Sequence, residues 1–569
     1  MQDRFHRILK QYWGYDSFRP LQEDIIRSID ANIDTLALMP TGGGKSITFQ
    51  VPALARDGLC LVVTPLVSLM RDQVQHLREK NILAATIFSE MGSHAIENTL
   101  SRCLYGNVKL LYISPERLGN ETFRNMLPTL NISMIAVDEA HCISQWGYDF
   151  RPAYLKIAEI RDLLPHVPIL ALTATATPDV IDDIKRQLHF RDNHNTFRKS
   201  FGRSNLHYIV RQVEDKPQYL LRILRSIRDG AVIIYTSSRA RTRDIATFLG
   251  EHDFPAEHFH AGLTSVKKNL IQEAWSKRET NVIVATNAFG MGIDRPDVRA
   301  VIHIDVPDSI ESYFQEAGRA GRDGNESYAV LLFNRKDEST LMRHIADRFP
   351  SEDQVRRVYA KLCYYLEIGV GEAYEQTFPV DVDTLCYRHH LMPNMFYGAL
   401  RMLQSNGYLQ LLDENDNASK LRILVSHEDL YQNWGLTPNE EETLDATMRM
   451  YTGLFTDHAY VNEDDIAARM GTDRQSVYTA LRGLTFKGIV SYIPYKRAPL
   501  VKFLTPRLDE SRIVTYRDTT LQQKRIYEHR IRSIIDYANA RQCRSQFLLR
   551  YFGESDATPC GNCDYCREH

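Results

Sequence analysis

The 569-residue sequence lacks any run of about 18 apolar residues, so we expect no transmembrane helix and no membrane partner. Its first residues are amphipathic and charged, unlike the apolar core of a secretory signal.

Cysteine is scarce. Of nine cysteines, five are scattered singly, which argues against a disulfide framework and favours a reducing, cytoplasmic compartment. The net charge of −3 gives no basic excess, but nucleic-acid binding needs only a local basic track. At this length we expect roughly three to five domains.

A glycine-rich segment, MPTGGGKS at residues 39–46, follows a short apolar run that we interpret as a strand. Such a turn before a helix gathers backbone N–H groups and a helix N-terminus around a polyphosphate. Lys45 is expected to reach the β- and γ-phosphates, and the Ser46 hydroxyl is expected to ligate Mg²⁺. The strict phosphate-loop pattern has glycine where this chain has Met39. The other loop residues that we assign to the nucleotide are Thr41, Gly42, Gly43 and Gly44.

An acidic motif, VDEAH at 137–141, follows the apolar run 134–137. Asp138 can hold Mg²⁺ through water, and Glu139 can orient the water that attacks the γ-phosphate. The alternative is a tight strand-to-helix turn at 39–46 and an unrelated, exposed acidic pair. Together the two motifs predict that the chain hydrolyses a nucleoside triphosphate.

Short apolar runs form two series on either side of a polar segment near 190–206. The runs are 58–65, 109–115, 133–140 and 168–175 in the first series, and 231–238, 281–288, 300–307 and 328–333 in the second. Helical stretches between the runs predict βα units with both sheet faces covered. Only the first series has a phosphate loop, so we expect two α/β lobes around one nucleotide site.

The second lobe carries two arginines, Arg319 and Arg322, within the segment 315–322. On a helix, residues three apart share a face. A guanidinium that is directed at the γ-phosphate can stabilise developing charge as an arginine finger, and it would be in place only when the lobes close. The alternative is a basic surface helix, although the two glycines in this segment would weaken such a helix.

The motifs, in the order in which they occur along the chain, resemble those of RecQ-type DNA helicases of superfamily 2. The resemblance covers roughly residues 1–340 and appears again at the C-terminus. The matching segments are YWGYDSFRPLQ (12–22), MPTGGGKS (39–46), TPLVSLMRDQV (64–74), YISPERL (112–118), DEAHCISQWGYDFRPAYL (138–155), LTATAT (172–177), IIYTSSR (233–239), FHAGL (259–263), VATNAFGMGIDRPDVRAVIH (284–303) and QEAGRAGRDG (315–324). The resemblance implies an α/β fold with two RecA-like parallel-sheet motor lobes, which we place at 1–205 and 206–345.

The resemblance also assigns nucleotide contacts. Tyr15 and Arg19 are expected to sandwich adenine while Gln22 reads its edge, which implies ATP as the nucleotide. Arg322 is the expected finger, with Arg319 in support. His141 either couples the site to the other lobe or is a structural histidine. Two further residues that the resemblance assigns to the nucleotide site are Gly292 and Asp294.

Nucleic acid is expected across the tops of both lobes. The residues that resemble backbone-contacting positions are Arg71, Arg117, Ser237, Arg239 and His260. Such contacts go to phosphates and fix register without reading sequence. Trp146, Phe150 and Arg151 lie in an aromatic-rich loop and offer stacking surface and charge for single-stranded bases. The competing interpretation places Trp146 in the core.

An internal repeat with an offset of 81 residues follows the motor: FYGALRMLQSNGYLQ recurs as VYTALRGLTFKGIVS. Helix, turn, second helix and hairpin is the winged-helix plan. We place a helical linker and the first repeat at 346–430 and the second repeat at 431–508. The second wing, predicted at 491–503, holds Tyr492 and Tyr495 and either wedges at a duplex fork or forms a dimer or scaffold surface.

The last segment, which we place at 509–569, is expected to be a helical zinc-binding module. Its metal ligands are predicted to be Cys543, Cys560, Cys563 and Cys566. Four thiolates suit a closed, tetrahedral structural Zn²⁺ site, and disulfides are the alternative. In the resembling family this element usually lies between the motor and a single winged helix, whereas here two repeats precede it.

The sequence therefore predicts an ATP-dependent DNA helicase that uses ATP, Mg²⁺ and Zn²⁺. The resemblance implies 3′→5′ movement on single-stranded DNA and unwinding of duplex, forked or branched DNA in recombination and repair. We expect a monomer in a bacterial cytoplasm, associated with the nucleoid, with a single-strand-binding protein as a candidate partner. The alternatives are an RNA-unwinding ATPase and a nucleotide-gated scaffold that binds branched DNA without unwinding it.

Overall fold

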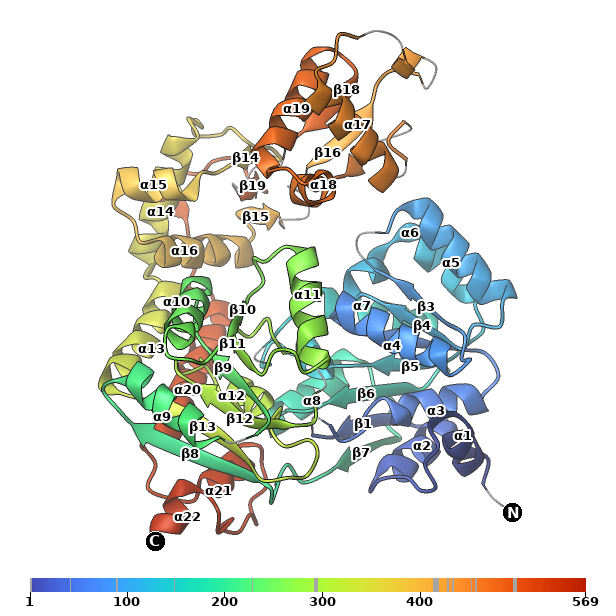
Figure 1. Cartoon of the computed structure of the whole chain (residues 1–569), viewed down its shortest axis with the longest axis vertical. Helices are drawn as coiled ribbons and strands as arrows, with labels where there is room; N and C mark the ends of the chain where they lie inside the picture. Colours follow the sequence, from blue (N-terminus) through green and yellow to red (C-terminus); the bar gives the residue numbers. More distant parts are fainter. Residues whose placement is uncertain are drawn as a thin grey trace. The chain divides into compact units, whose positions relative to one another are not determined.

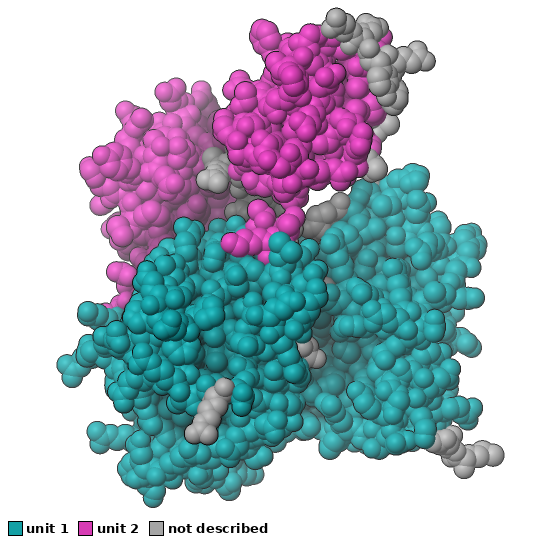
Figure 2. Space-filling view, in the orientation of Figure 1, with its two compact units in different colours: residues 1–263, 268–338, 529–569 teal, residues 264–267, 339–528 magenta. Residues whose placement is uncertain are grey.

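The computed structural model describes residues 3–40, 42–88, 91–147, 149–227, 229–290, 295–412, 419–426, 429–431, 434–451, 453–455, 458–494 and 499–569. Within these ranges, no helix combines the length and the apolar character needed to cross a membrane. The chain divides into two compact units, which Figure 2 distinguishes by colour. The first unit holds residues 1–263, 268–338 and 529–569, and the second holds 264–267 and 339–528.

The first lobe is built on a seven-stranded parallel sheet with the order β3-β4-β2-β5-β6-β1-β7. Its strands are β1 (Asp34–Leu38), β2 (Leu59–Val63), β3 (Ala84–Ile87), β4 (Leu110–Ile113), β5 (Ile132–Val137), β6 (Ile169–Thr173) and β7 (His194–Arg198). Every residue of β1, β2, β4 and β6 is buried, as expected when helices cover both faces of a sheet. The helices of this lobe (Figure 1) are α1 (Arg4–Trp13), α2 (Gln22–Asp30), α3 (Ile47–Ala55), α4 (Val67–Glu79), α5 (Ser93–Tyr105), α6 (Glu121–Met126), α7 (Lys156–Leu163) and α8 (Pro178–Gln187).

The second lobe has a six-stranded parallel sheet with the order β10-β11-β9-β12-β13-β8. Its strands are β8 (Leu206–Gln212), β9 (Ala231–Tyr235), β10 (Glu257–Phe259), β11 (Val282–Ala285), β12 (Val298–His303) and β13 (Ser327–Phe333). The helices between and after them are α9 (Lys216–Ser226), α10 (Arg239–Gly250), α11 (Ser265–Ser276), α12 (Ile310–Ala317) and α13 (Arg335–Arg348). The two parallel-sheet lobes predicted from the apolar runs are confirmed.

Strand order places the predicted motifs at one edge of the first sheet. Strand β6 pairs in parallel with β1 on one side and with β5 on the other. The phosphate loop follows β1, the acidic motif follows β5, and Thr173 ends β6. Because parallel strands end at the same edge, all three segments meet at the carboxyl ends of neighbouring strands, where open α/β sheets bind ligands.

The C-terminal helices belong to the same compact unit as the lobes. They are the end of α20 (Asp518–Asn539), α21 (Arg544–Tyr551) and α22 (Asp564–Glu568). The Asp564 carboxylate accepts the backbone N–H of Val210 in β8 at 3.0 Å. Glu554 accepts the backbone N–H of Phe201, in the connector between the lobes, at 2.9 Å. The helical four-cysteine module therefore packs on the second lobe and on the connector.

The second unit contains two small helical subdomains, each with its own core and its own antiparallel sheet. The first comprises α14 (Glu352–Tyr365), α15 (Val382–His389) and α16 (Pro393–Ser405) with β14 (Thr377–Pro379), β15 (Leu409–Leu412) and β19 (Leu500–Phe503). The second comprises α17 (Pro438–Met450), α18 (Glu463–Met470) and α19 (Arg474–Phe486) with β16 (Lys420–Ile423), β17 (Ala459–Tyr460) and β18 (Val490–Ile493).

The repeat is visible in the equivalent helices α16 and α19. Leu400 and Leu403 are fully buried in α16, and so are their counterparts Leu481 and Leu484 in α19. The glycine that follows each helix, Gly407 or Gly488, has φ of 80° or 75°, which glycine adopts without strain. These shared features support the winged-helix-like repeats that the sequence predicted.

The wings, however, pair differently from the expected local hairpin at 491–503. Strand β18 pairs with β16, whereas β19 pairs with β15 of the first subdomain. The second subdomain is thus inserted between β15 and β19, and the predicted boundaries 346–430 and 431–508 cut across both subdomains. Burial explains the pairing: Val501 and Phe503 complete the first core, and Val490 completes the second.

Candidate active site

The phosphate loop lies between β1 and α3 in a conformation that requires glycine. Gly42 and Gly44 have φ of 79° and 77°. A Cβ on Gly44 would also overlap the side-chain amide nitrogen of Gln22, and one on Gly43 would lie 2.8 Å from the Pro40 carbonyl oxygen. Because these positions are glycines, no side chain covers this part of the loop backbone, where a phosphate chain would approach. Thr41 lies outside the described residues.

Side chains from α2 and the segment before it hold this loop. The Gln22 amide donates to the carbonyl oxygens of Gly44 at 2.9 Å and Gly43 at 3.5 Å. Its carbonyl oxygen accepts the backbone N–H of Arg19 at 2.8 Å, and the Arg19 guanidinium donates to Gly42 at 2.8 Å. Gln22 and Arg19 thus support the loop directly. Tyr15 is 52% exposed, as a stacking surface would be, and adenine recognition by these three residues stays a prediction.

Lys45 and the acidic motif face each other across the site. The Lys45 ammonium lies 3.5 Å from Glu139, and both side chains are largely buried. Burial raises the pKa of Asp138 to about 6, and the neighbouring Glu139 charge adds to this rise. Burial also opposes ionisation of Glu139, but the adjoining Lys45 ammonium, with a smaller contribution from Arg319, outweighs it and lowers the pKa of Glu139. Glu139 therefore stays ionised to lower pH than Asp138, and a nearby cation would favour the ionised form of Asp138 further.

Glu139 is held in an unusual backbone conformation. Its φ of 47° is left-handed, and it begins the short helix η3 (Ala140–Ile143). Such strain in a non-glycine residue persists where surrounding contacts fix it, and it is concentrated at functional sites. His141, which is 1% exposed, lies 2.9 Å from the Thr173 hydroxyl and 3.3 Å from Glu139. Burial lowers the pKa of His141, so the ring links the end of β6 to the acidic motif chiefly as a hydrogen-bonding group.

The two arginines of the second lobe lie in turns and not on the helix that we considered. Helix α12 ends at Ala317, and Arg319 and Arg322 come after it. The Arg322 side chain reaches the phosphate loop: a Cβ on Gly42 would lie 3.7 Å from its Cγ. Arg319 donates to the Gly290 carbonyl of its own lobe. Arg322 is therefore the arginine that reaches the phosphate loop, as expected of the finger. Gly292 and Asp294 lie outside the described residues.

The aromatic-rich loop follows η3 and is only partly buried. Trp146 and Phe150 both keep intermediate exposure, so neither is a core residue. Arg151 donates to the Pro65 carbonyl at 3.3 Å and pairs with Asp149 at 3.2 Å, which fixes the loop base against the segment after β2. Trp146 is thus presented beside the acidic motif with part of its surface available for stacking.

The remaining first-lobe candidates for nucleic acid, Arg71 in α4 and Arg117 after β4, both contact Phe88, which follows β3. The Arg71 guanidinium is 4.7 Å from the Phe88 ring centre, and Arg117 donates to the Phe88 carbonyl at 3.1 Å. In the second lobe, Ser237 follows β9 and His260 follows β10, and Arg239 is exposed at the start of α10. All five are therefore at carboxyl edges of the two sheets.

Of the two predicted wing residues, Tyr492 is buried. Tyr492 is 7% exposed, and its hydroxyl donates to the buried Glu463 within the second subdomain. Burial, together with that carboxylate, raises the pKa of Tyr492 well above its usual range. This side chain belongs to the core, which corrects its assignment as a DNA contact. Tyr495 lies outside the described residues.

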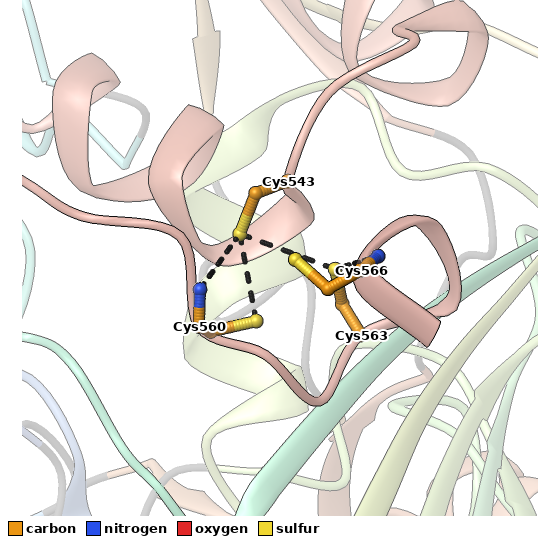
Figure 3. A group of neighbouring side chains, drawn as sticks. All are labelled: Cys543, Cys560, Cys563 and Cys566. Atoms are coloured by element: carbon orange, nitrogen blue, oxygen red, sulfur yellow. Dashed lines mark hydrogen bonds between the residues drawn. The ribbon is translucent and has the colours of Figure 1, made fainter. Parts of the chain in front are cut away.

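Four cysteines of the C-terminal module converge (Figure 3). Their sulfurs all lie within 4.8 Å of one another, and Cys543 and Cys560 are 3.5 Å apart. Four sulfurs at about 2.3 Å from a central Zn²⁺ lie about 3.8 Å apart, so the cluster fits the ion. Backbone N–H groups of Cys560 and Gln546 point at the Cys543 sulfur at 3.2 and 3.5 Å, and such donors stabilise a thiolate. None of the nine cysteines forms a disulfide, so the disulfide alternative is not supported.

Three contributors had escaped the sequence reasoning. Thr173, which lies 2.9 Å from His141, belongs to the segment LTATAT at 172–177, but nothing in that segment indicates this contact. Asp305 accepts both the N–H and the hydroxyl of Ser237 at 2.9 Å. Arg530, in α20, donates to the carbonyl of Trp146, and no local pattern in its helix signals this contact.

Family models match four stretches of the chain. They are DEAD/DEAH box helicase at 19–184, helicase conserved C-terminal domain at 215–324, RecQ helicase winged-helix domain, Bacteroidota, at 421–494, and RecQ zinc-binding at 507–567. The winged-helix match spans β16 to β18, which is the inserted subdomain. The zinc-binding match contains all four clustered cysteines.

Curated relatives point the same way. "ATP-dependent DNA helicase RecQ" of Bacillus subtilis (strain 168) is 42% identical over 364 residues, 64% of this chain and 61% of that protein. The protein of the same name in Pasteurella multocida (strain Pm70) is 39% identical over 341 residues, 60% of this chain and 54% of that protein. "Probable ATP-dependent DNA helicase RecS" of Bacillus subtilis (strain 168) is 38% identical over 384 residues, 65% of this chain and 77% of that protein. The chain thus spans less than two thirds of the length of the two RecQ relatives.

Solved structures share the fold. Mss116p bound to single-stranded RNA and AMP-PNP has a TM-score of 0.51 at 16% identity, with 72% of this chain and 92% of that chain covered. The DUF1998 helicase MrfA bound to DNA has a TM-score of 0.50 at 16% identity, with 72% of this chain and 61% of that chain covered.

Proposed function

The chain belongs to the RecQ family of helicases, and from this premise we propose that it is an ATP-dependent DNA helicase. The observation that carries the proposal is that segments of both lobes contribute to one site. Lys45 lies 3.5 Å from Glu139, and Arg322 reaches the same phosphate loop from the second lobe. A site completed by both lobes ties hydrolysis to their relative movement, which is what a translocating motor needs.

Each group has a role in this proposal. Mg²⁺, held by Ser46 and through water by Asp138, supplies positive charge to the phosphates when bound. Lys45 binds the terminal phosphates, and Glu139, kept ionised by its neighbours, orients the attacking water. Arg322 stabilises the charge that develops during transfer. The backbone N–H groups of Gly42 and Gly44 act as donors to the phosphates, whereas that of Gly43 donates to the Pro40 carbonyl at 2.9 Å.

DNA is proposed to lie along the carboxyl edges of the two sheets. Arg71, Arg117, Ser237, Arg239 and His260 would contact phosphates, which gives affinity without sequence preference. The aromatic-rich loop would stack single-stranded bases on its partly exposed rings. Separation of one base-pair step costs about 1.4 kcal/mol in stacking, which one hydrolysis event exceeds.

The proposal is tested by ATP hydrolysis with and without single-stranded DNA, and with single-stranded RNA of the same sequence. We expect strong stimulation by DNA and weak stimulation by RNA; the reverse order would favour an RNA-unwinding ATPase. Duplexes with a 3′ or a 5′ single-stranded tail test polarity, and unwinding of the 3′-tailed substrate alone is expected. Binding of branched DNA with no unwinding of either substrate would favour the scaffold alternative.

The finer assignments rest on the family resemblance. They are a role in recombination and repair, a monomeric state, a place in the bacterial cytoplasm near the nucleoid, and an interaction with a single-strand-binding protein. Sedimentation of the purified chain tests its monomeric state. A pull-down with a purified single-strand-binding protein tests the partner.

A further inference from the structure

Arg530, on the C-terminal helix α20, joins the aromatic-rich loop of the first lobe to helix α12 of the second. Its guanidinium donates to the backbone carbonyl of Trp146. Its Nε lies 3.8 Å from the Glu311 carboxylate. The Arg530 side chain is 11% exposed and that of Glu311 is 6% exposed, so the bridge is screened from water and its charges interact strongly.

The two ends of this bridge are the parts that must communicate during DNA-dependent hydrolysis. Trp146 comes only a few residues after Glu139, in the loop proposed to stack bases. Glu311 is in the first turn of α12, and the arginine-bearing turns follow the last residue of the same helix. Because α12 has eight residues with a buried core face, a displacement at its first turn is carried to its end.

A second contact fixes the Glu311 end. The Tyr551 hydroxyl, from α21 of the zinc-binding module, donates to Glu311 at 3.0 Å. At the other end of α12, the Glu316 carboxylate lies 2.8 Å from the His303 ring. The helix is thus held at both ends by buried polar contacts, and one of its anchors belongs to the same module as Arg530.

We propose that Arg530 is a positioning residue that relays occupancy of the aromatic-rich loop to Arg322 through Glu311 and α12. The inference rests on the proposed function and extends it: the zinc-binding module becomes part of the coupling between DNA and ATP, besides its structural role. Arginine suits this task because its planar guanidinium can serve a carbonyl and a carboxylate at once and stays charged at all relevant pH values.

The test is Arg530→Ala, with Arg532→Ala as the matched control, since Arg532 is exposed on the same helix two residues away. ATP hydrolysis is titrated with single-stranded DNA. We expect the maximal DNA stimulation to fall at least about fivefold, as loss of a typical coupling energy would cause. The DNA concentration for half-maximal stimulation and the rate without DNA are expected to stay as in the wild type, because phosphate contacts and the catalytic groups are untouched. Arg532→Ala is expected to match the wild type throughout.

Glu311→Gln guards against a simple loss of stability. Glutamine keeps the size of the side chain and an acceptor for Tyr551 but removes the charge that attracts Arg530. It is expected to lower maximal stimulation as Arg530→Ala does, with an unchanged melting temperature. Arg530→Lys, which keeps the charge and loses the fork, is expected to restore stimulation in part.

Full stimulation in both Arg530→Ala and Glu311→Gln would overturn the relay while leaving the helicase assignment in place. A wild-type protein that DNA does not stimulate would overturn the helicase assignment and the relay with it. Loss of stimulation that is matched by an equal rise in the half-maximal DNA concentration would also overturn the relay, because it would place Arg530 in DNA binding.

Discussion

The side-chain amide of Gln22 donates to the carbonyl oxygen of Gly44 at 2.9 Å, and Gln22 itself is 1% exposed. The residue expected to read adenine therefore also holds the phosphate loop. Its two roles make different predictions, because a loop support acts on every nucleotide whereas an adenine contact acts on ATP alone.

Gln22→Ala is expected to raise the KM for ATP about fivefold, as loss of a hydrogen bond worth about 1 kcal/mol would do. Measurement of the KM for ATP and for GTP separates the two roles. If Gln22 only supports the loop, both values rise together; if it reads adenine, the value for ATP rises more and the preference for ATP shrinks. Gln75→Ala, at an exposed position on α4, serves as the control, and an unchanged KM in Gln22→Ala would contradict both roles.

Trp146→Ala is expected to lose most of the DNA stimulation of ATP hydrolysis and most of the unwinding, because it removes the ring on which bases stack. Stacking contributes roughly 1–3 kcal/mol per base, enough to shift the loop beside Glu139. DNA affinity should fall only modestly, since phosphate contacts supply most of it. Phe150→Ala should behave similarly.

The measurement is melting temperature beside DNA-stimulated ATP hydrolysis. Trp146 is partly exposed, so the melting temperature of Trp146→Ala is expected to stay close to that of the wild type. A core tryptophan would instead cost several kcal/mol of folding free energy on truncation. A destabilised variant that still responds normally to DNA would refute the role of Trp146 in coupling DNA binding to ATP hydrolysis.

Cys563→Ser is expected to lower both zinc content and melting temperature. The wild type should carry about one zinc per chain, and a serine hydroxyl is a poor replacement for a thiolate ligand. The adjacent Asp564 accepts the backbone N–H of Val210, so loss of the metal should also loosen the module on the second lobe. Metal analysis and thermal unfolding provide the readouts, with Cys103→Ser in the first lobe as a control that keeps its zinc. A stable wild-type protein without metal would remove the zinc assignment.

The inserted subdomain is expected to be removable. Leu412 of β15 pairs with Leu500 of β19, so a two-residue Asn-Gly turn can replace residues 413–499 and close a hairpin. We expect this deletion to stay folded and to retain ATP hydrolysis, because the core that contains Val501 and Phe503 is left whole.

Deletion of 431–508, the segment that the sequence repeat alone suggested, is the matched comparison. It removes β19 and leaves the edge of β15 that pairs with β19 without a partner strand, so low solubility is expected. Solubility, circular dichroism and thermal unfolding of the two deletions decide between the topologies. A folded 431–508 deletion beside an insoluble 413–499 deletion would contradict the insertion.

The parts of this protein that sequence predicts well are those encoded locally. The loop at Gly42 to Gly44 and the pair Asp138-Glu139 follow buried strands, and parallel pairing of β1, β6 and β5 then brings them to one edge. The four cysteines are equally recognisable, since Cys560, Cys563 and Cys566 have only two residues between neighbours and ligand spacing is a local property.

What sequence did not predict depends on distant pairing. Strand β19 joins β15 across about 90 residues, and a local hairpin with β18 would satisfy the same alternating pattern. Tyr492 looked like a wing residue because tyrosine suits exposed and buried positions alike; its buried partner Glu463 decides the matter. The contact of Arg530 with Trp146 joins residues 384 positions apart and leaves no local signature.

Strand separation on a forked DNA duplex tests the central claim most directly. Fluorescent release of one strand is followed with ATP and Mg²⁺ for the wild type, Lys45→Ala and Glu139→Gln, while circular dichroism and DNA binding verify that each variant is intact. The wild type is expected to unwind the fork. Both variants are expected to bind it without unwinding it, because one cannot hold the terminal phosphates and the other cannot orient the attacking water. Unwinding by either variant at the wild-type rate, or a wild type that hydrolyses ATP but never separates the strands, would contradict the account.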